Sequence, residues 1–86
     1  MTLTIINEKG LHARASAKLV ETVERFDAEA TLSKDGIEAA GDSIMGLLML
    51  GAARGSDIAV EVSGPQAGEL ATALETLVGD YFGEGM

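Results

Sequence analysis

The clearest structural signal in the chain is the stretch Asp57-Ile58-Ala59-Val60-Glu61-Val62-Ser63, in which polar and apolar residues alternate. Alternation with a period of two predicts a β-strand that buries one face. Gly64-Pro65 ends this strand, and Pro65 suits the start of a helix. A helix is predicted from about Gln66 to Tyr81, because apolar residues there recur at spacings of three and four. These residues are Ala67, Leu70, Ala71, Leu74, Leu77, Val78 and Tyr81.

The residues that precede this strand predict a hairpin and a short helix. Strands are expected at Ala30–Ser33 and Ile37–Ala40, and Asp35-Gly36 between them is a good signal for a tight hairpin turn. The segment Ile44–Leu50 is apolar and is followed by Gly51, which predicts a short helix that stops at that glycine.

The N-terminal part of the chain adds one strand and one amphipathic helix. Thr2–Ile6 alternates as a half-buried strand does, and Asn7–Gly10 is typical of a turn. Ala13–Phe26 is expected to be helical, with an apolar face made of Ala13, Ala17, Val20 and Val23. The predicted order is therefore β-α-β-β-α-β-α. This order indicates an α+β fold in two layers, with three helices on one face of a mainly antiparallel sheet.

Composition limits the function classes that the chain can serve. Its 86 residues suffice for one compact domain, expected to span residues 1–86 and to end in a frayed tail at Gly83–Met86. Cys is absent and His occurs once, which excludes disulfides, thiolate nucleophiles and clusters of imidazole metal ligands. The net charge of −8 disfavours nucleic acid and anionic membranes as partners. Without a signal peptide or a membrane-spanning stretch, we expect a soluble cytoplasmic protein with no metal and no cofactor.

The segment Gly10–Ala17 carries the residues best suited to chemistry. A turn delivers His12, the only histidine, to the start of a helix, where unpaired backbone N–H groups and the helix dipole favour an anion. A neutral imidazole is a competent nucleophile towards phosphorus, and Arg14 can offer two parallel hydrogen bonds to phosphate oxygens. The residues alone also allow a simpler interpretation, in which His12 is a helix cap or an ordinary surface residue.

Two separated segments resemble one known family. Gly10-Leu11-His12-Ala13-Arg14 is similar to the active-site motif of the histidine-containing phosphocarrier protein (HPr) family of the bacterial phosphotransferase system. The segment Asp42–Gly51 resembles that family's regulatory serine and the short helix after it. Chain length and element order also match, so the resemblance covers essentially the whole sequence. It implies an open-faced two-layer fold with a four-stranded antiparallel sheet.

The resemblance implies a carrier rather than an enzyme with its own turnover. His12 would accept a phosphoryl group at Nδ1 from phosphorylated enzyme I, whose own donor is phosphoenolpyruvate. It would then donate the group to a histidine of an enzyme IIA protein. Arg14 occupies the position of the family's active-site arginine, where it would stabilise the phosphate. The family is usually monomeric, so a monomer is expected.

Ser43 has two interpretations. Serine is well suited to cap a helix that starts at Ile44, although Asp42 could also serve. The resemblance instead implies a regulatory phosphorylation site for an HPr kinase/phosphorylase, which some bacteria have. This second interpretation supports an alternative function, a regulatory binding module that is switched by phosphorylation of Ser43.

The short helix predicted at Ile44–Leu50 has almost no polar face, so some of its apolar side chains should be exposed. Scattered exposed apolar residues are common in small domains. In the family, however, this helix lies beside the active histidine and contacts partner proteins. Ile44, Met45 and Leu48 are the expected docking residues, and methionine adapts well to partners of different shape.

One residue departs from the family pattern. The family often has proline directly after the motif arginine, whereas this chain has Ala15. Proline fits the first turn of a helix but is not needed there, so the chemistry is expected to be intact. With the acidic balance and Ser16, the change favours the nitrogen-related branch over sugar uptake. A small ferredoxin-like ligand-binding domain would also explain the layered pattern, but not the two motifs.

Overall fold

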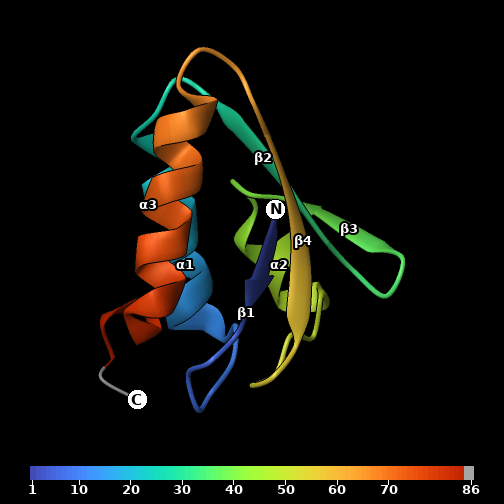
Figure 1. The fold of residues 1–86 in the computed structure, drawn as a ribbon. Helices are drawn as coiled ribbons and strands as arrows, with labels where there is room; N and C mark the ends of the chain where they lie inside the picture. Colours follow the sequence, from blue (N-terminus) through green and yellow to red (C-terminus); the bar gives the residue numbers. More distant parts are fainter. Residues whose placement is uncertain (85–86) are drawn as a thin grey trace.

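The computed structural model describes residues 1–84 and contains the predicted α+β architecture (Figure 1). The elements, in chain order, are β1 (Thr2–Thr4), α1 (Ala13–Glu24), β2 (Glu29–Lys34), β3 (Ile37–Ala40), α2 (Ile44–Met49), β4 (Asp57–Ser63), α3 (Ala67–Gly79) and a short 3-10 turn, η1 (Tyr81–Gly83). The number and order of the long elements match the prediction. Their ends differ from it by at most two residues, which is the usual uncertainty of helix and strand ends.

The four strands form one antiparallel sheet in the order β1-β4-β2-β3. The registers place Leu3 opposite Ile58, and Leu32 opposite both Val60 and Ala39. All five side chains are buried, because they point to the face that the helices cover. The other face carries exposed residues, which confirms the predicted open-faced sheet with helices on one side (Figure 1).

Two predicted turn signals are confirmed. Asp35 and Gly36 both adopt positive φ, at 52° and 80°, and they join β2 to β3 with Lys34 opposite Ile37. Consecutive left-handed residues give a turn whose twist matches that of the flanking strands. Gly51 ends α2 with φ 63°, and its N–H donates to the Leu48 carbonyl.

The buried face of α1 is rotated by part of a turn from the predicted one, so that prediction is wrong in part. Ala13 is exposed and Ala17 is only partly buried, whereas Ala15, Ser16 and Leu19 are buried with Val20 and Val23. Leu19 is the largest apolar side chain of the helix, so packing it against the sheet decides which face turns inward. Arg14 is consequently exposed, and its side chain is free to serve the site described below.

The predicted frayed tail is wrong within the described residues. α3 stops at Gly79, and Tyr81 and Phe82 both adopt φ 54°, which turns the chain back towards α1. Phe82 is therefore the buried aromatic residue, in place of Tyr81, which is 37% exposed. The turn holds Gly83 and Glu84 against the body of the molecule, while Gly85 and Met86 lie outside the described residues.

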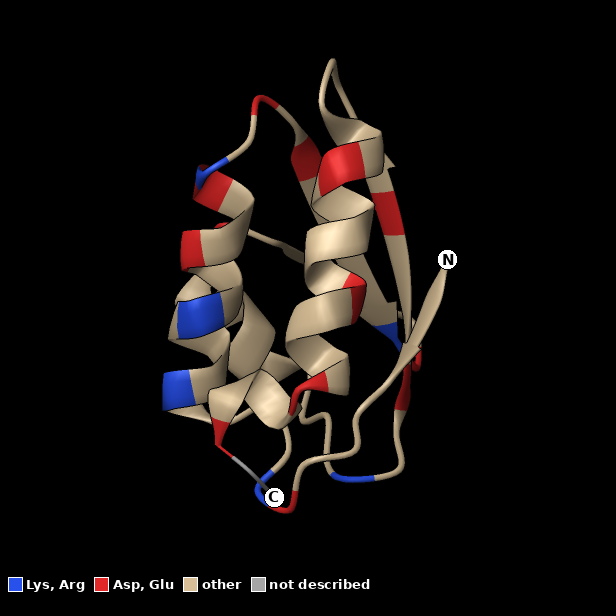
Figure 2. Cartoon of the chain, turned by 60° about the vertical axis from the view of Figure 1, so that its left-hand side comes forward, with Lys and Arg blue, Asp and Glu red and all other residues tan. Residues whose placement is uncertain are grey.

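Charge is distributed unevenly over this acidic chain. Acidic residues occur on most elements, whereas three of the six Lys and Arg residues fall on or directly after α1 (Figure 2). These three are Arg14, Lys18 and Arg25. In the part of the chain that the structure describes, no helix is long and apolar enough to cross a membrane.

Candidate functional site

The turn before α1 is fixed by a close approach between two backbone segments. Gly10 has φ 67°, and a Cβ atom on it would lie 2.5 Å from the carbonyl oxygen of Ala52. The N–H of the next residue, Leu11, donates to that same oxygen at 2.8 Å, and the Leu11 side chain is buried. Glycine is therefore needed at position 10, because it adopts this φ without strain and has no Cβ to collide with the Ala52 carbonyl. This contact locks the residue before His12 to the loop that follows α2.

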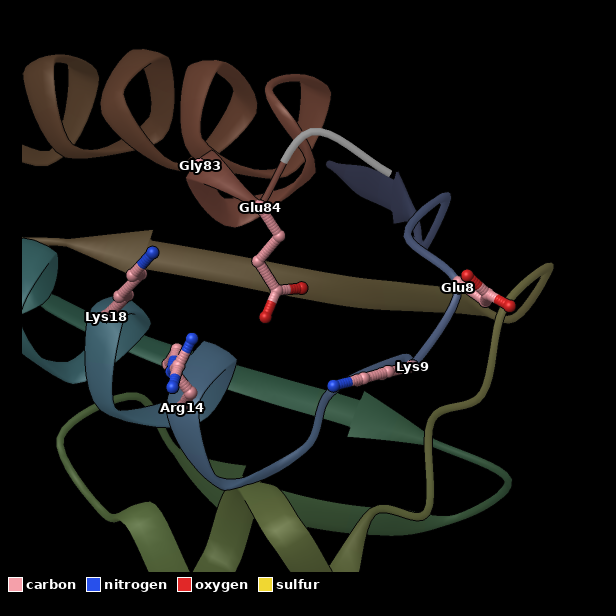
Figure 3. Close-up of a pocket in the computed structure, with 6 residues that line it drawn as sticks. All are labelled: Glu8, Lys9, Arg14, Lys18, Gly83 and Glu84. Carbon is pink, nitrogen blue, oxygen red and sulfur yellow. The ribbon is translucent and has the colours of Figure 1, made fainter.

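A cavity of about 310 Å³ opens beside this turn (Figure 3). It is lined by Glu8, Lys9, Arg14, Lys18, Gly83 and Glu84. Three of the six basic residues of the chain therefore face one cavity, although the net charge of the protein is −8. Glu8 and Glu84 offset two of these three charges, which leaves the lining with a formal charge of +1 in a protein whose net charge is −8. This local positive balance favours a small anion at the cavity.

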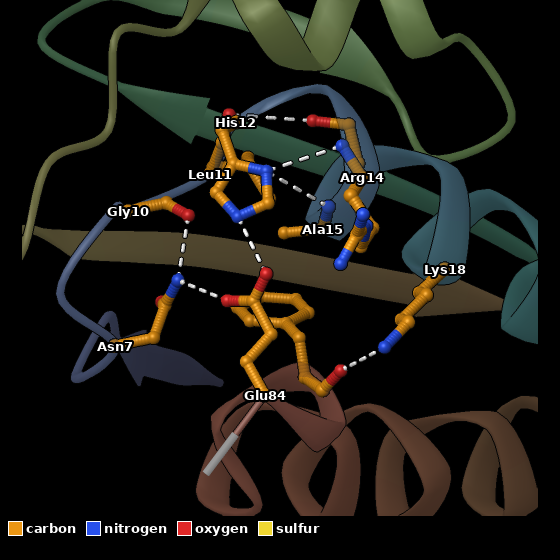
Figure 4. A network of polar contacts seen from close by, with 10 residues as sticks. Asn7, Gly10, Leu11, His12, Arg14, Ala15, Lys18 and Glu84 are labelled. Atoms are coloured by element: carbon orange, nitrogen blue, oxygen red, sulfur yellow. Dashed lines mark hydrogen bonds and ion pairs between the residues drawn. The ribbon is translucent and has the colours of Figure 1, made fainter. Parts of the chain in front are cut away.

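His12 is the N-cap residue of α1 and caps the helix with its own ring (Figure 4). Nδ1 accepts hydrogen bonds from the backbone N–H of Arg14 at 3.1 Å and of Ala15 at 3.4 Å. The expectation of unpaired N–H groups at this helix start is thus wrong for these two groups, because the imidazole occupies them. A nitrogen that accepts two N–H donors carries no proton, so the neutral ring holds its proton on Nε2.

Nε2 of His12 faces a carboxylate that the sequence did not predict. Glu84 Oε2 lies 2.7 Å from Nε2, and Oε1 accepts a hydrogen bond of 3.2 Å from Nδ2 of Asn7 (Figure 4). Asn7 is fully buried and also donates to the Gly10 carbonyl at 2.8 Å. Burial raises the pKa of Glu84, but hydrogen bonds from His12 and Asn7, together with attraction to the His12 ring when it is protonated and to Lys18, outweigh burial and lower it.

Ala15 contributes a donor that the residue more common in the family could not. Proline has no backbone N–H. With proline at position 15, the hydrogen bond from residue 15 to Nδ1 would be lost and that from Arg14 would remain. Ala15 is also fully buried, in the first turn of α1 next to the His12 ring. Alanine at position 15 therefore adds a hydrogen bond to Nδ1 of His12.

Ser43 caps α2, and Asp42 does not. The backbone N–H of Gly46 donates to Ser43 Oγ at 3.0 Å, and Ser43 has the extended backbone of an N-cap residue. The capping interpretation of Ser43 is confirmed. Ser43 is only partly buried at the start of α2.

One side of α2 exposes apolar residues, as predicted. Met45 is 69% and Met49 71% exposed, and Ile44 and Leu48 are exposed to a smaller extent, whereas Leu47 is buried. We call Ile44, Met45, Leu48 and Met49 the α2 patch. Met49 was not among the expected docking residues, although a position four residues after Met45 lies on the same helix face. The loop after α2, with Gly51, Ala52 and Ala53, borders a depression shared with His12.

Comparison with known proteins gives a consistent result. The family model described as the PTS HPr component phosphorylation site matches residues 1–80. Phosphocarrier protein HPr of Neisseria meningitidis is 45% identical over 84 residues, covering 98% of this chain and 94% of that protein. Phosphocarrier protein NPr of Escherichia coli K12 is 44% identical over 84 residues, covering 96% and 93%. The crystal structure of HPr from Thermoanaerobacter tengcongensis has a TM-score of 0.94 at 34% identity, covering 100% of this chain and 97% of that one.

Proposed function

The chain belongs to the HPr family of the bacterial phosphotransferase system, and from this premise we propose that His12 carries the phosphoryl group on Nδ1. Membership of the family supports a phosphocarrier role in that system. The observation that carries the assignment to one atom is the capping geometry of His12. Nδ1 carries no proton, and its lone pair faces the backbone N–H groups at the positive end of α1, beside a cavity lined by three basic and two acidic residues.

The geometry suggests how the carried group is stabilised. When Nδ1 forms a bond to phosphorus, its lone pair no longer accepts hydrogen bonds. The N–H groups of Arg14 and Ala15, which lie 3.1 and 3.4 Å from Nδ1, can then donate to phosphoryl oxygens. The Arg14 guanidinium lines the adjacent cavity and adds charge-assisted hydrogen bonds. Helix and arginine together replace part of the hydration of the phosphoryl group.

The partners follow from the same proposal. Phosphorylated enzyme I is the donor, and an enzyme IIA protein is the acceptor. Ile44, Met45 and Leu48 in the α2 patch would contact both, because the loop after α2 borders His12. The chain would act as a single-domain monomer in the cytoplasm. Among the two branches of the family, Ala15 favours the nitrogen-related one; identities of 45% to an HPr and 44% to an NPr support both equally well.

Ser43 supports a second, regulatory function. Ser43 is partly exposed at the start of α2, directly before Ile44 and Met45 of the α2 patch. A phosphate added there by an HPr kinase/phosphorylase would place about two negative charges next to the docking residues and so change partner binding. A variant Ser43→Asp that abolishes partner binding, while His12→Ala leaves it unchanged, would favour this regulatory module over the carrier.

The carrier function is tested by incubation with enzyme I and phosphoenolpyruvate, followed by intact-mass measurement. The expected result is a gain of one phosphoryl mass that is lost in acid, stable in base and absent from His12→Ala. No gain, or a gain that survives His12→Ala, would contradict the proposal. Ser43→Ala is the matched control, because it removes the other candidate phosphorylation site and should leave the gain intact.

A further inference from the structure

We propose that Glu84 is a positioning residue that keeps the proton on Nε2 of His12 throughout the transfer cycle. The inference rests on the proposed function of His12. Glu84 Oε2 lies 2.7 Å from Nε2, and the two side chains are 15% and 24% exposed, so the contact is largely shielded from solvent. The opposite ring nitrogen faces two N–H donors. The two ends of the ring thus select the same tautomer, with the proton on Nε2 and the lone pair on Nδ1.

Neighbouring groups hold Glu84 and the turn that carries it in place. Asn7 is fully buried and donates to Glu84 Oε1, and Lys18 Nζ donates to the Phe82 carbonyl at 2.6 Å. Phe82 is buried and anchors the turn. The positive φ of Tyr81 and of Phe82 is unfavourable for non-glycine residues, and such conformations persist where the surroundings fix them. The surrounding structure therefore fixes the turn that brings Glu84 to His12.

The carboxylate matters most when the ring acquires charge. As Nδ1 bonds to phosphorus, the bond between phosphorus and the donor breaks and its electron pair leaves with the donor. The imidazole then carries a positive charge with its proton still on Nε2. Onward transfer breaks the Nδ1–P bond, returns its electron pair to Nδ1 and restores the neutral ring. Glu84 stabilises the charged intermediate without taking the proton, so neither step requires proton exchange at Nε2.

Other charges near the ring make this contact more important. Lys9, Arg14 and Lys18 line the cavity next to Glu84. Each is positively charged and therefore disfavours a positive charge on the imidazole. Glu8 lines the same cavity, but its side chain makes no hydrogen bond with His12. Glu84 is the carboxylate that contacts the ring. Without its charge, the phosphorylated ring should lose the Nε2 proton at lower pH.

The test is a pH titration of the phosphorylated protein, followed by ¹⁵N NMR of the His12 ring. The protein is phosphorylated with enzyme I and phosphoenolpyruvate in three forms, wild type, Glu84→Gln and Glu75→Gln. Glu84→Gln keeps an oxygen acceptor for the Nε2 proton but removes the charge. The titration midpoint of Nε2 should fall by about one pH unit or more in this variant, which is the usual effect of losing an opposite charge in contact. Glu75→Gln removes an exposed charge on α3 and should titrate as wild type does.

The outcomes separate this inference from the function on which it rests. Equal midpoints in wild type and Glu84→Gln, with both proteins phosphorylated, would overturn the role of Glu84 and leave the carrier function standing. A wild-type chain that takes up no phosphoryl group would overturn the carrier function, and the role of Glu84 with it. Glu84→Asp keeps the charge on a shorter side chain, so a midpoint between those of wild type and Glu84→Gln would support the proposal. A Glu84→Asp midpoint equal to that of Glu84→Gln would count against it.

Discussion

The backbone N–H of Arg14 donates to Nδ1 of His12 at 3.1 Å, while the Arg14 guanidinium lines the cavity beside the ring. One residue thus approaches the carrier site with two different groups. The backbone group donates to Nδ1, the proposed phosphoryl acceptor, and the exposed side chain is proposed to bind the phosphoryl oxygens. The two contributions can be separated, because a side-chain substitution leaves the N–H in place.

Arg14→Ala should slow phosphoryl uptake from enzyme I by roughly 10- to 100-fold, since a hydrogen bond to a charged group contributes about 1.5–3 kcal/mol. Arg14→Lys should lie between this variant and wild type, because lysine keeps the charge but not the paired donors. Arg25→Ala at the other end of α1 is the charge-matched control. Rapid-quench kinetics measure the effect, and equal rates for Arg14→Ala and Arg25→Ala would argue against a role for the guanidinium.

Gly10→Ala should destabilise the protein more than Gly51→Ala. Both glycines have similar positive φ, 67° and 63°, so alanine costs about 1–2 kcal/mol at either position. At Gly51 there is open space, whereas at Gly10 a Cβ would lie 2.5 Å from the Ala52 oxygen and 2.9 Å from Ala53 Cα. Gly10→Ala should therefore lower the free energy of unfolding by about 2 kcal/mol more than Gly51→Ala. Urea denaturation gives both values, and equal losses would show that the close approach is absent.

The contribution of Glu84 to stability should depend on pH. Burial raises the pKa of Glu84, but its hydrogen bonds and nearby positive charges lower it on balance below the value in the unfolded chain, which is about 4.3. A lowered carboxyl pKa stabilises the folded state above the unfolded pKa, and this stabilisation is lost as pH falls through the folded value. The difference in free energy of unfolding between wild type and Glu84→Gln should thus shrink as pH falls below the pKa of the unfolded chain and through the lower pKa of the folded state. Denaturation at several pH values tests this, and a difference that grows in acid would contradict it.

Met45→Ala should weaken binding to enzyme I by about tenfold, because burial of a large apolar side chain contributes about 1.5–3 kcal/mol. Ile37→Ala is the control, since Ile37 is also a large exposed apolar residue but lies at the hairpin between β2 and β3. Titration calorimetry with enzyme I measures both affinities. If Ile37→Ala weakens binding as much as Met45→Ala does, the α2 patch is not the docking surface.

Most of the fold could be predicted because its signals are local. The alternation at Asp57–Ser63, the turn at Asp35-Gly36 and the stop at Gly51 each depend on a few neighbouring residues. The inward face of α1 was missed, because small alanines mark a face weakly and the position of Leu19 decides the packing.

The contact between Glu84 and His12 could not be predicted, because it joins residues that are far apart in the sequence. Glu84 meets His12 across 72 positions in the chain, and it lies in a Gly-rich segment without periodicity. Phe82 is the one local signal, since a large aromatic residue just beyond a helix tends to find a place in the core. Asn7 was predicted as an ordinary turn residue, and its burial becomes evident only when the last turn covers it.

The most direct test of the carrier site identifies the phosphorylated atom and follows its discharge. The protein, labelled with ¹⁵N in histidine, is phosphorylated with enzyme I and phosphoenolpyruvate and examined by ³¹P and ¹⁵N NMR before and after addition of an enzyme IIA protein. We predict that phosphorus is bonded to Nδ1 of His12 and that this signal disappears as the enzyme IIA protein becomes phosphorylated. Phosphorus on Nε2 or on Ser43, or a signal on Nδ1 that the acceptor does not discharge, would contradict the account.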